Sequence, residues 1–431
     1  MAFLTQISNQ THTPLKPVDD ASIKDRSNAN VSLAGKDVLD DEAERWQYFF
    51  DSGVSSWFED IKEVTFTSTF CTLTPIEAQV IVDHWEARRS RLAATHDSND
   101  NNDDDDDSSR QLQLDLQDLV QEATFKLSNL MKRLNVAVDA ETKLSSVNKA
   151  FVKLSTRSPK DSKKALERAK VEYQRRVDEL GGASSVDDND RWRILCEETT
   201  RSSAVSNGAQ ALELLLDSDR VYEDLEYALR GPPESWIQEQ GTSSTTESSS
   251  SSSSSSSTLG KEKTLAWNMS LVARAWDPRL RPESEFRGIC WNNELTCLCQ
   301  YFHPLLFPEL ASLREQILSD IQTAFSNDSV RRAVNRLGGH CILDFAWLGP
   351  GDVIIVELNP FDGVCLGTFP ASTGLFLWDK PVDQQVMKGE TEFEFRLREI
   401  PLSKSELKNN CNSAWREIIY NSSSSSAGGK E

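Results

Sequence analysis

The sequence lacks the short motifs that mark many nucleotide-using and hydrolytic enzymes. It has no Gly-x-x-x-x-Gly-Lys-Ser/Thr loop, no Gly-x-Gly-x-x-Gly, no Gly-x-Ser-x-Gly and no His-Glu-x-x-His. These absences disfavour P-loop nucleotidases, Rossmann dehydrogenases, α/β-hydrolases and zinc peptidases. Asp344-Phe345-Ala346 is similar to the Asp-Phe-Gly of protein kinases. Because no His-Arg-Asp loop precedes it, a protein kinase is disfavoured as well.

Apolar residues are scarce, and no apolar run approaches the ~20 residues of a spanning helix, which predicts a protein outside the membrane. Hydrophobic residues make up 38% of the chain, and mean hydropathy is -0.50. The start MAFLTQISNQ lacks the charge and apolar core of a secretory signal, and the eight cysteines are scattered. Both features predict a cytoplasmic protein.

Positive charge is in deficit, with 47 basic against 68 acidic residues and a net charge of -21. This balance disfavours direct binding to nucleic acid or to anionic lipid and suits a basic partner surface. A chain of 431 residues is long enough for two lobes. We expect an N-terminal lobe over residues 41–270 and a C-terminal lobe over 271–420, with tails at 1–40 and 421–431. Within the first lobe, an acidic segment at 96–109 and a serine-rich segment at 237–262 predict disordered insertions.

The most informative stretch is a predicted β-hairpin within residues 341–363. Two apolar runs, 341–347 and 353–358, flank the turn sequence Leu-Gly-Pro-Gly-Asp. Simple alternation places Val353, Ile355, Glu357 and Asn359 on one face. Asp344 then lies opposite either Val356 or Glu357, and a one-residue bulge decides between the two registers.

If Asp344 lies opposite Glu357, three oxygen-bearing side chains meet on this hairpin: Asp344, Glu357 and Asn359. Two carboxylates this close repel each other unless a positive charge lies between them, and Mg²⁺ shared with nucleotide phosphates would supply it. The alternative is that these residues only mark strand ends and face water.

Basic residues on other predicted strands are candidate phosphate ligands. Lys153 lies between the apolar residues Val152 and Leu154, so its ammonium needs a buried partner or lies on an edge strand. Arg274 and Arg287 suit polyphosphate because a guanidinium donates two hydrogen bonds at once. The alternative for Arg287 is a surface ion pair with Glu285 or Asp277.

Four ordered blocks resemble the cell division cycle protein 123 family of ATP-grasp proteins, which are assembly factors for eukaryotic translation initiation factor 2. The blocks span about residues 43–85, 149–162, 271–300 and 341–380. They contain Trp57-Phe58, the Lys153-to-Asp161 segment KLSTRSPKD, Glu285-Phe286-Arg287, and Leu-Asp-Phe followed by Glu-Leu-Asn-Pro-Phe at 357–361.

The resemblance implies an α/β (α+β) protein with an ATP-grasp-like two-lobe fold, mostly antiparallel sheets and flanking helices. It implies ATP and Mg²⁺ as cofactors, with Asp344, Glu357 and Asn359 holding the metal. The expected ATP contacts come from Lys153, Ser155, Leu271, Val272, Arg274, Arg287 and Gln300. The implied function is assembly of the initiation factor through its gamma subunit by a monomer, with no catalytic residue assigned.

Four departures from the family pattern are visible. Ser155 stands where the family has asparagine, Thr156 where it has tryptophan, and Tyr301 follows Gln300 where the family has arginine. Glu357 also replaces an expected aspartate. Two other functions therefore remain as alternatives: an ATP-grasp ligase or phosphotransferase acting on an unknown acceptor, and a diverged scaffold that binds no nucleotide.

Overall fold

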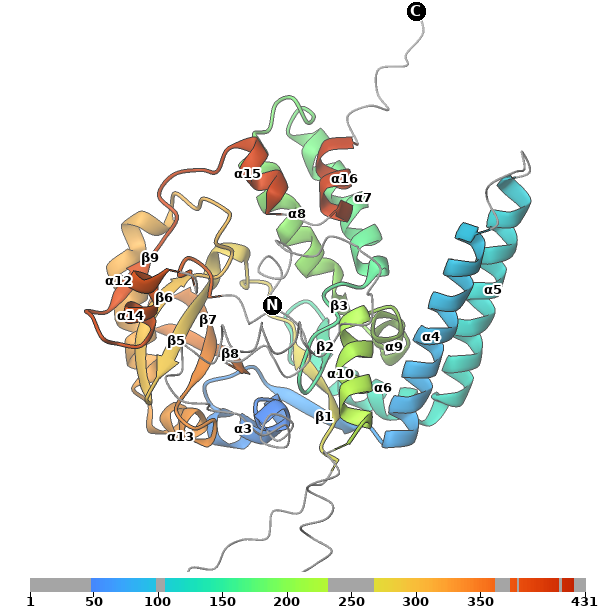
Figure 1. The fold of residues 1–431 in the computed structure, drawn as a ribbon, viewed down its shortest axis with the longest axis horizontal. Coiled ribbons are helices and arrows are strands. Elements are labelled where there is room, and N and C mark those ends of the chain that lie inside the picture. Colours follow the sequence, from blue (N-terminus) through green and yellow to red (C-terminus); the bar gives the residue numbers. More distant parts are fainter. Residues whose placement is uncertain are drawn as a thin grey trace, which may run out of the picture.

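The computed structural model describes residues 48–97, 105–231, 267–360, 373–377, 380–410 and 413–421. Two sheets with helices on their outer faces form the protein, and Figure 1 shows the helical pair α4 and α5 standing out from the rest. The strands are β1 Ser68–Thr72, β2 Ala150–Leu154, β3 Ala204–Val205, β4 Ser270–Ala275, β5 Glu285–Trp291, β6 Glu294–Gln300, β7 Cys341–Gly349, β8 Asp352–Pro360 and β9 Glu394–Arg396.

Helices account for most of the remaining regular structure. They are α3 Val54–Ile61, α4 Pro75–Asp97, α5 Asp105–Lys126, α6 Ser128–Thr142, α7 Lys163–Glu179, α8 Asp188–Ser202, α9 Gly208–Leu216, α10 Asp219–Leu229, the 3-10 turn η1 Pro282–Ser284, α12 Leu310–Phe325, α13 Asp328–Arg336, α14 Pro381–Met387, α15 Lys404–Asn409 and α16 Ser413–Asn421. The described chain is thus of the predicted α+β class.

The first sheet has the order β1-β4-β2-β3, and all of its neighbouring strands are antiparallel. Alternation along β2 and β4 separates its two faces. Val152, Leu154 and Leu271 enter a core that includes Leu134 of α6 and Leu215 of α9. Lys153 therefore lies on the opposite face, the one turned toward the second sheet.

The second sheet has the order β8-β7-β5-β6-β9, with only the short β6–β9 pair parallel. One face is apolar and packs against α12 and α13: Phe286, Leu343 and Phe345 share a core with Ile317 and Val334. The same core includes Trp57 of α3 and Trp192 of α8. Segments from before residue 270 thus complete the core of the second sheet.

β4 also crosses the boundary that we expected at residue 270. It pairs with β1 and β2 in the middle of the first sheet, although the sequence division assigned residues 271–275 to the second lobe. The isolated bridge between Thr65 and Ile355 joins the two sheets on the other side of this boundary. The two lobes are therefore interlocked by segments that each receives from the other half of the chain.

The β7–β8 hairpin has the predicted turn and the second of the two predicted registers. Gly351 has a φ of 74°, which favours glycine after Pro350 in a tight reversal. A bulge at Val356 places Asp344 directly opposite Glu357. The bulge also corrects the simple alternation: Ile355 enters the apolar core, whereas Glu357 faces the first sheet.

Other expectations were met less completely. The apolar positions between Leu112 and Leu134 recur at helical spacing and predict one helix, but the structure has two, α5 and α6, separated at the buried Leu127. The many charged residues of α7 predict an exposed helix, but α7 buries Tyr173 and Val177 in the core of the second sheet. Part of the acidic segment at 96–109 is helical, because α4 continues to Asp97 and α5 begins at Asp105. The predictions for 1–40, 98–104, 237–262 and 422–431 lie outside the described residues, as do Trp378 and Asp379 near the end of the fourth block that resembles the family.

Candidate functional site

A buried ion pair joins the two sheets at the centre of the molecule. Lys153 of β2 and Glu357 of β8 form a salt bridge between side chains that are 2% and 10% exposed. These residues are 204 positions apart in the sequence. The sequence prediction that the ammonium of Lys153 must find a buried partner is confirmed, and the partner is one of the predicted metal ligands.

A second ion pair lies beside the first on the same face of the second sheet. Arg287 donates from Nε to Oδ1 of Asp344 and from Nη2 to Oδ2, each over 2.8 Å. Asn359 donates from Nδ2 to the same Oδ2 over 2.8 Å. Strand register explains the arrangement, since Glu357, Asp344 and Arg287 are directly opposite one another across β8, β7 and β5. The alternative surface pairs for Arg287 are wrong.

Arg274 connects the first sheet to the bulge that sets this register. Its Nη1 donates to the carbonyl oxygen of Val356, the bulged residue, over 2.7 Å. Its guanidinium carbon lies 5.8 Å from the ring centroid of Phe66 and 5.9 Å from that of Trp57. Arg274 thus lies at the edge of the ion cluster and holds the backbone that presents Glu357.

Electrostatics shift the pKa values of the paired groups according to their partners. Burial is the largest single influence on the pKa of Glu357 and would raise it, but the nearby cations, Lys153 first and Lys160 after it, together outweigh burial and hold this pKa well below its usual range. For Lys153 the desolvation is larger than the attraction of Glu357, so its pKa is lowered. Asp344 raises the pKa of Arg287 despite burial. The cluster therefore holds an ionised Glu357 in a nearly dry site.

Two further buried groups face this cluster, and the sequence prediction did not assign them to the site. Burial lowers the pKa of Lys160 to about 7, against the attraction of Glu357 and Glu285. Burial also raises the pKa of Glu285 to about 7, with the charge of Lys160 opposing. Tyr301 links Lys160 to the cluster, because Lys160 Nζ and Arg287 Cζ lie 5.9 and 4.7 Å from its ring centroid. Lys160 and Glu285 could have been identified in the sequence from their positions in the motifs Ser-Pro-Lys-Asp and Glu-Phe-Arg.

Four of the residues predicted to contact ATP have their side chains elsewhere. Leu271 faces the core of the first sheet, and Val272 belongs to the core of the second. The amide of Gln300 is engaged with backbone, donating to Phe302 and Leu305 and accepting from Arg398. Ser155 is buried with its hydroxyl 3.4 Å from Sδ of Met269. Contact of these residues with a nucleotide stays a prediction.

The predicted metal ligands do come together. Asp344, Glu357 and Asn359 supply two carboxylates and an amide, the hard oxygen donors that Mg²⁺ prefers. In this arrangement both carboxylates contact cationic side chains. No group of three or more His, Cys, Asp or Glu side chains in the described ranges is arranged to hold a metal by itself. The donor chemistry fits Mg²⁺, with the amide as the third ligand.

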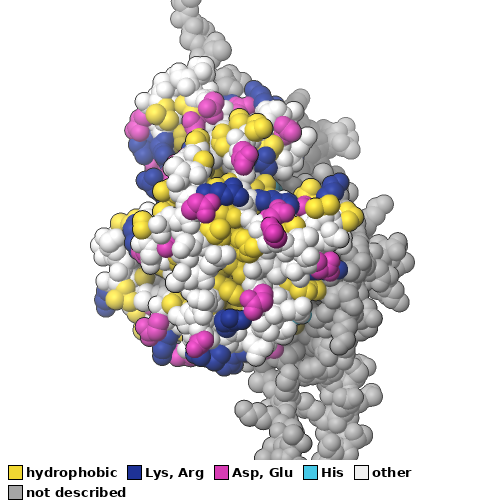
Figure 2. Space-filling model, turned by 90° about the vertical axis from the view of Figure 1, so that its left-hand side faces the viewer, with side chains coloured by type: hydrophobic (Ala, Val, Ile, Leu, Met, Phe, Trp, Pro, Cys, Tyr) yellow, Lys and Arg dark blue, Asp and Glu magenta, His cyan; other side chains and the backbone are white. Residues whose placement is uncertain are grey.

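Two hollows are candidates for ligand binding. A cavity of about 30 Å³ adjoins the cluster and is lined by Lys153, Arg274 and Glu357 among others. A wider groove of about 540 Å³ lies along residues 393–400 and Arg314, at the β9 edge of the second sheet. Figure 2 shows hydrophobic side chains gathered on the face seen from that side, with lysines and arginines beside them. Of these two hollows, the first is lined by the buried Lys153–Glu357 pair. None of the described helices is long and apolar enough to cross a bilayer.

Comparisons with known proteins agree with the resemblance seen in the sequence. The family model D123 matches residues 196–415. Two solved structures, of Cdc123 from Schizosaccharomyces pombe and of its C-terminally truncated form, each share 16% identity with this chain at a TM-score of 0.42. Both alignments cover 83% of this chain and 98% of the other. A search of curated proteins found no match.

Fold and site together define an α+β protein in which two mostly antiparallel sheets enclose a cluster of buried, mutually paired charges. The family model extends over half of the sequence and includes β4 to β9, the strands that carry most of the cluster. The chain belongs to the D123 family, the family of Cdc123.

Proposed function

We propose that this protein is an ATP- and Mg²⁺-binding assembly factor that promotes formation of the eukaryotic translation initiation factor 2 complex through its gamma subunit. Family membership supports the role in assembly. The observation that supports nucleotide binding is the meeting of Lys153, Glu357, Arg287 and Asp344 between the two sheets. The net charge of -21 suits a basic surface on the partner.

The internal pairing of the cluster suggests how it would receive its ligands. Lys153 and Arg287 would exchange their carboxylate partners for phosphate oxygens, which an ammonium and a guanidinium bind well. The carboxylates of Glu357 and Asp344, released from those cations, would hold Mg²⁺ together with the amide oxygen of Asn359. The metal would neutralise phosphate charge. Lys153, Arg287, Asp344 and Glu357 would each keep an opposite partner before and after the exchange, so none of these four groups becomes an isolated buried ion.

Lys160 would strengthen the positive side of this exchange. The cluster contains four buried cations, Lys153, Lys160, Arg274 and Arg287, and three buried carboxylates, Glu285, Asp344 and Glu357. Four minus three leaves one positive charge, so the site favours an anionic ligand. Binding of a phosphate near Lys160 would raise the pKa of its ammonium from about 7 and keep it protonated at neutral pH.

Thermal unfolding with and without Mg-ATP tests nucleotide binding. A ligand at a hundredfold excess over its Kd stabilises the folded state by ~2.7 kcal/mol, which raises Tm measurably. We expect this shift in the natural protein and its loss in the double variant Asp344→Asn/Glu357→Gln. The matched control is Glu294→Gln/Asp352→Asn, because these carboxylates lie on the same sheet but are exposed. If millimolar Mg-ATP left the Tm of the natural protein unchanged, the proposal would be contradicted.

The partner is tested separately by affinity capture. Tagged protein should retain the gamma subunit of initiation factor 2 from a eukaryotic lysate, detected by an antibody against that subunit. Capture should increase with Mg-ATP and fall to background in Asp344→Asn/Glu357→Gln. Equal capture of the gamma subunit by the natural protein and by the double variant would show that partner binding does not depend on the nucleotide.

One observation favours the scaffold as a second candidate. Both predicted metal-binding carboxylates are already neutralised by cations of the chain, so the fold is electrostatically complete without a ligand. Tyr301 also occupies the position where the family pattern has arginine. A scaffold would retain the gamma subunit equally with and without nucleotide and would show no Tm shift with Mg-ATP.

A further inference from the structure

The groove along residues 393–400 is the larger of the two hollows and follows one edge of the second sheet. β9 is the last strand in the order of this sheet, so one of its edges has no neighbouring strand among the described residues. The groove has a volume of about 540 Å³, within the ~300–1,000 Å³ typical of ligand sites. Its lining contains none of the residues that we assigned to the nucleotide or the metal. The groove is therefore separate from the ion cluster.

Apolar side chains form much of the groove. Besides the buried Phe395, the lining contains Leu375, Phe393, Leu397 and Ile400. The side chain of Ile400 is 75% exposed, among the most exposed of the large apolar residues described. Figure 2 shows hydrophobic side chains gathered on the face of the molecule seen from this side. An occupant that covered Ile400 would be stabilised by the apolar area removed from water.

The lining combines both faces of the sheet. Phe395 and Leu397 pack in the core on the side of α12. The guanidinium of Arg396 instead lies 4.1 Å from the ring centroid of Phe376, which belongs to the separate apolar cluster of the other face. An extended peptide that follows the edge meets both faces, because its successive side chains point to opposite sides.

The backbone at this edge is bonded to a side chain rather than to another strand. The carbonyl oxygen of Phe395 accepts a hydrogen bond from Nη2 of Arg314 on α12. A peptide added as a strand would offer a backbone N–H to the same carbonyl. Arg314 would then be free to bind a carboxylate of that peptide.

The charge of the groove favours an acidic occupant. Arg314 and Arg398 have no carboxylate partner among the described residues, and both donate to backbone carbonyls instead. Both are half-buried. Arg396, in contrast, pairs with Asp383 and Glu394 over 2.7 Å each. The lining has three arginines and two glutamates, which leaves one positive charge in a chain whose net charge is -21.

We propose that this groove binds an extended, acidic segment of a partner protein, in which carboxylates are interspersed with apolar side chains. The carboxylates bind Arg314 and Arg398, the apolar side chains cover Phe393 and Ile400, and the backbone adds to the sheet at Phe395. Because the groove is separate from the proposed nucleotide site, this binding does not depend on Mg-ATP.

The test measures fluorescence anisotropy with the full chain and a labelled peptide in which pairs of glutamates alternate with pairs of valines. This pattern places both residue types on each side of an extended strand. One control peptide has lysine in place of glutamate. A second has N-methyl groups on alternate backbone amides, which removes the donors needed for strand addition.

Two variants of the protein test the groove itself. Ile400→Asp places a repelling charge at an exposed position, where the fold is not at risk, and Ile76→Asp is its matched control because Ile76 is 79% exposed on α4. Arg314→Gln removes one of the unpaired cations, and Arg331→Gln removes a comparably accessible arginine from α13.

We expect the acidic peptide to bind the natural protein and both control variants equally, and to bind Ile400→Asp and Arg314→Gln at least ~tenfold more weakly. The lysine and N-methyl peptides should lose affinity by a similar factor. The double variant Asp344→Asn/Glu357→Gln should bind the acidic peptide normally, so failure of the nucleotide proposal would leave this inference intact.

The inference would be overturned if the acidic peptide did not bind, if the lysine or N-methyl peptide bound as well, or if Ile400→Asp bound it unchanged. Sedimentation of the natural protein without peptide supplies a further check. A dimer that Ile400→Asp dissociates would assign the groove to a second copy of this chain and would overturn the inference as well.

Discussion

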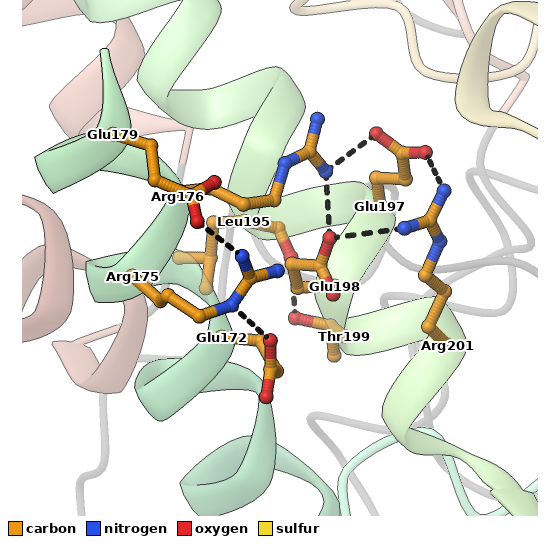
Figure 3. Close-up of polar contacts among 9 residues, drawn as sticks. All are labelled: Glu172, Arg175, Arg176, Glu179, Leu195, Glu197, Glu198, Thr199 and Arg201. Carbon is orange, nitrogen blue, oxygen red and sulfur yellow. Dashed lines mark hydrogen bonds and ion pairs between the residues drawn. The ribbon is translucent and has the colours of Figure 1, made fainter.

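Two clusters of oppositely charged residues contain the same residue types but differ in how deeply these residues are buried. On α7 and α8, Arg176 bridges Glu197 and Glu198 over 2.7 and 2.6 Å, and Arg175 bridges Glu172 and Glu179 over 2.9 and 2.6 Å. Figure 3 shows two sets of contacts on these packed helices, one around Arg176 and Arg201 and the other around Arg175, and together they are called the helical network here. Most of its members are partly or well exposed. The cluster between the sheets instead buries Lys153, Glu357, Arg287 and Asp344 almost completely.

The difference shows that burial and sequence separation, rather than the number of ion pairs, decide what a charge cluster does. Exposed pairs gain little because water already solvates each charge and salt screens their attraction. A buried pair contributes little net stability either, but losing one partner leaves an isolated charge out of water. The helical network can therefore tolerate substitution, whereas the cluster between the sheets cannot.

Breaking the central pair should produce the largest effect. Lys153→Met leaves Glu357 buried without its cation, and we expect a loss of ~3–5 kcal/mol in the free energy of unfolding. The double variant Lys153→Met/Glu357→Gln removes both charges and should recover most of that loss. Urea unfolding followed by circular dichroism measures both. Equal instability of the single and the double variant would mean that packing, rather than charge, supports this position.

The raised pKa of Glu285 makes the stability of the folded protein depend on pH. Its folded pKa is raised to about 7, so the folded protein holds a proton that the unfolded chain releases near pH ~4.5. Its contribution to stability is therefore fully present below ~4.5 and is lost as the pH rises through about 7, by at most ~1.4 kcal/mol per pH unit for one proton. Glu285→Gln should flatten the stability profile over this window. An identical slope in both proteins would contradict the raised pKa.

The sequence predicted the hairpin, its turn and the polar residues that meet on it because those features are local. Gly-Pro-Gly between two apolar runs defines the reversal, and polar residues inside apolar strands indicate a buried site. It could not choose the register, since a bulge at Val356 depends on the carbonyl contact with Arg274, a residue 82 positions away. The pairing of Lys153 with Glu357 is equally non-local, which is why the sequence left its partner open.

From the sequence, the burial of α7 was underestimated, and α8 was not predicted. Charged residues dominate both helices, and their apolar positions are too few to indicate a deep face by themselves. Tyr173, Val177, Trp192 and Leu195 nevertheless reach the core of the second sheet, because packing between the helices and the sheet supplies the burial that each helix lacks alone. Tertiary contact, rather than local pattern, determined this part of the fold.

An intermediate effect is expected at the bridge between α7 and α8. Arg176 contacts both Glu197 and the nearly buried Glu198, whose side chain is 5% exposed. Arg176→Met should cost ~1 kcal/mol, since Arg201 remains near Glu198 and water reaches the rest of the network. The same urea titration measures it. A loss as large as that of Lys153→Met would remove the distinction between the two clusters.

The smallest effect is expected at the outer end of the network, where Arg175 is 55% exposed and pairs with Glu172 and Glu179 on its own helix. Arg175→Gln removes a charge from an i,i+3 and an i,i+4 pair while keeping good helix propensity. The Tm should therefore stay within measurement error of the natural protein, and 1 M salt should not change the difference. A marked, salt-sensitive loss in Arg175→Gln would show that this exposed ladder supports the fold, and exposure would then no longer separate the two clusters.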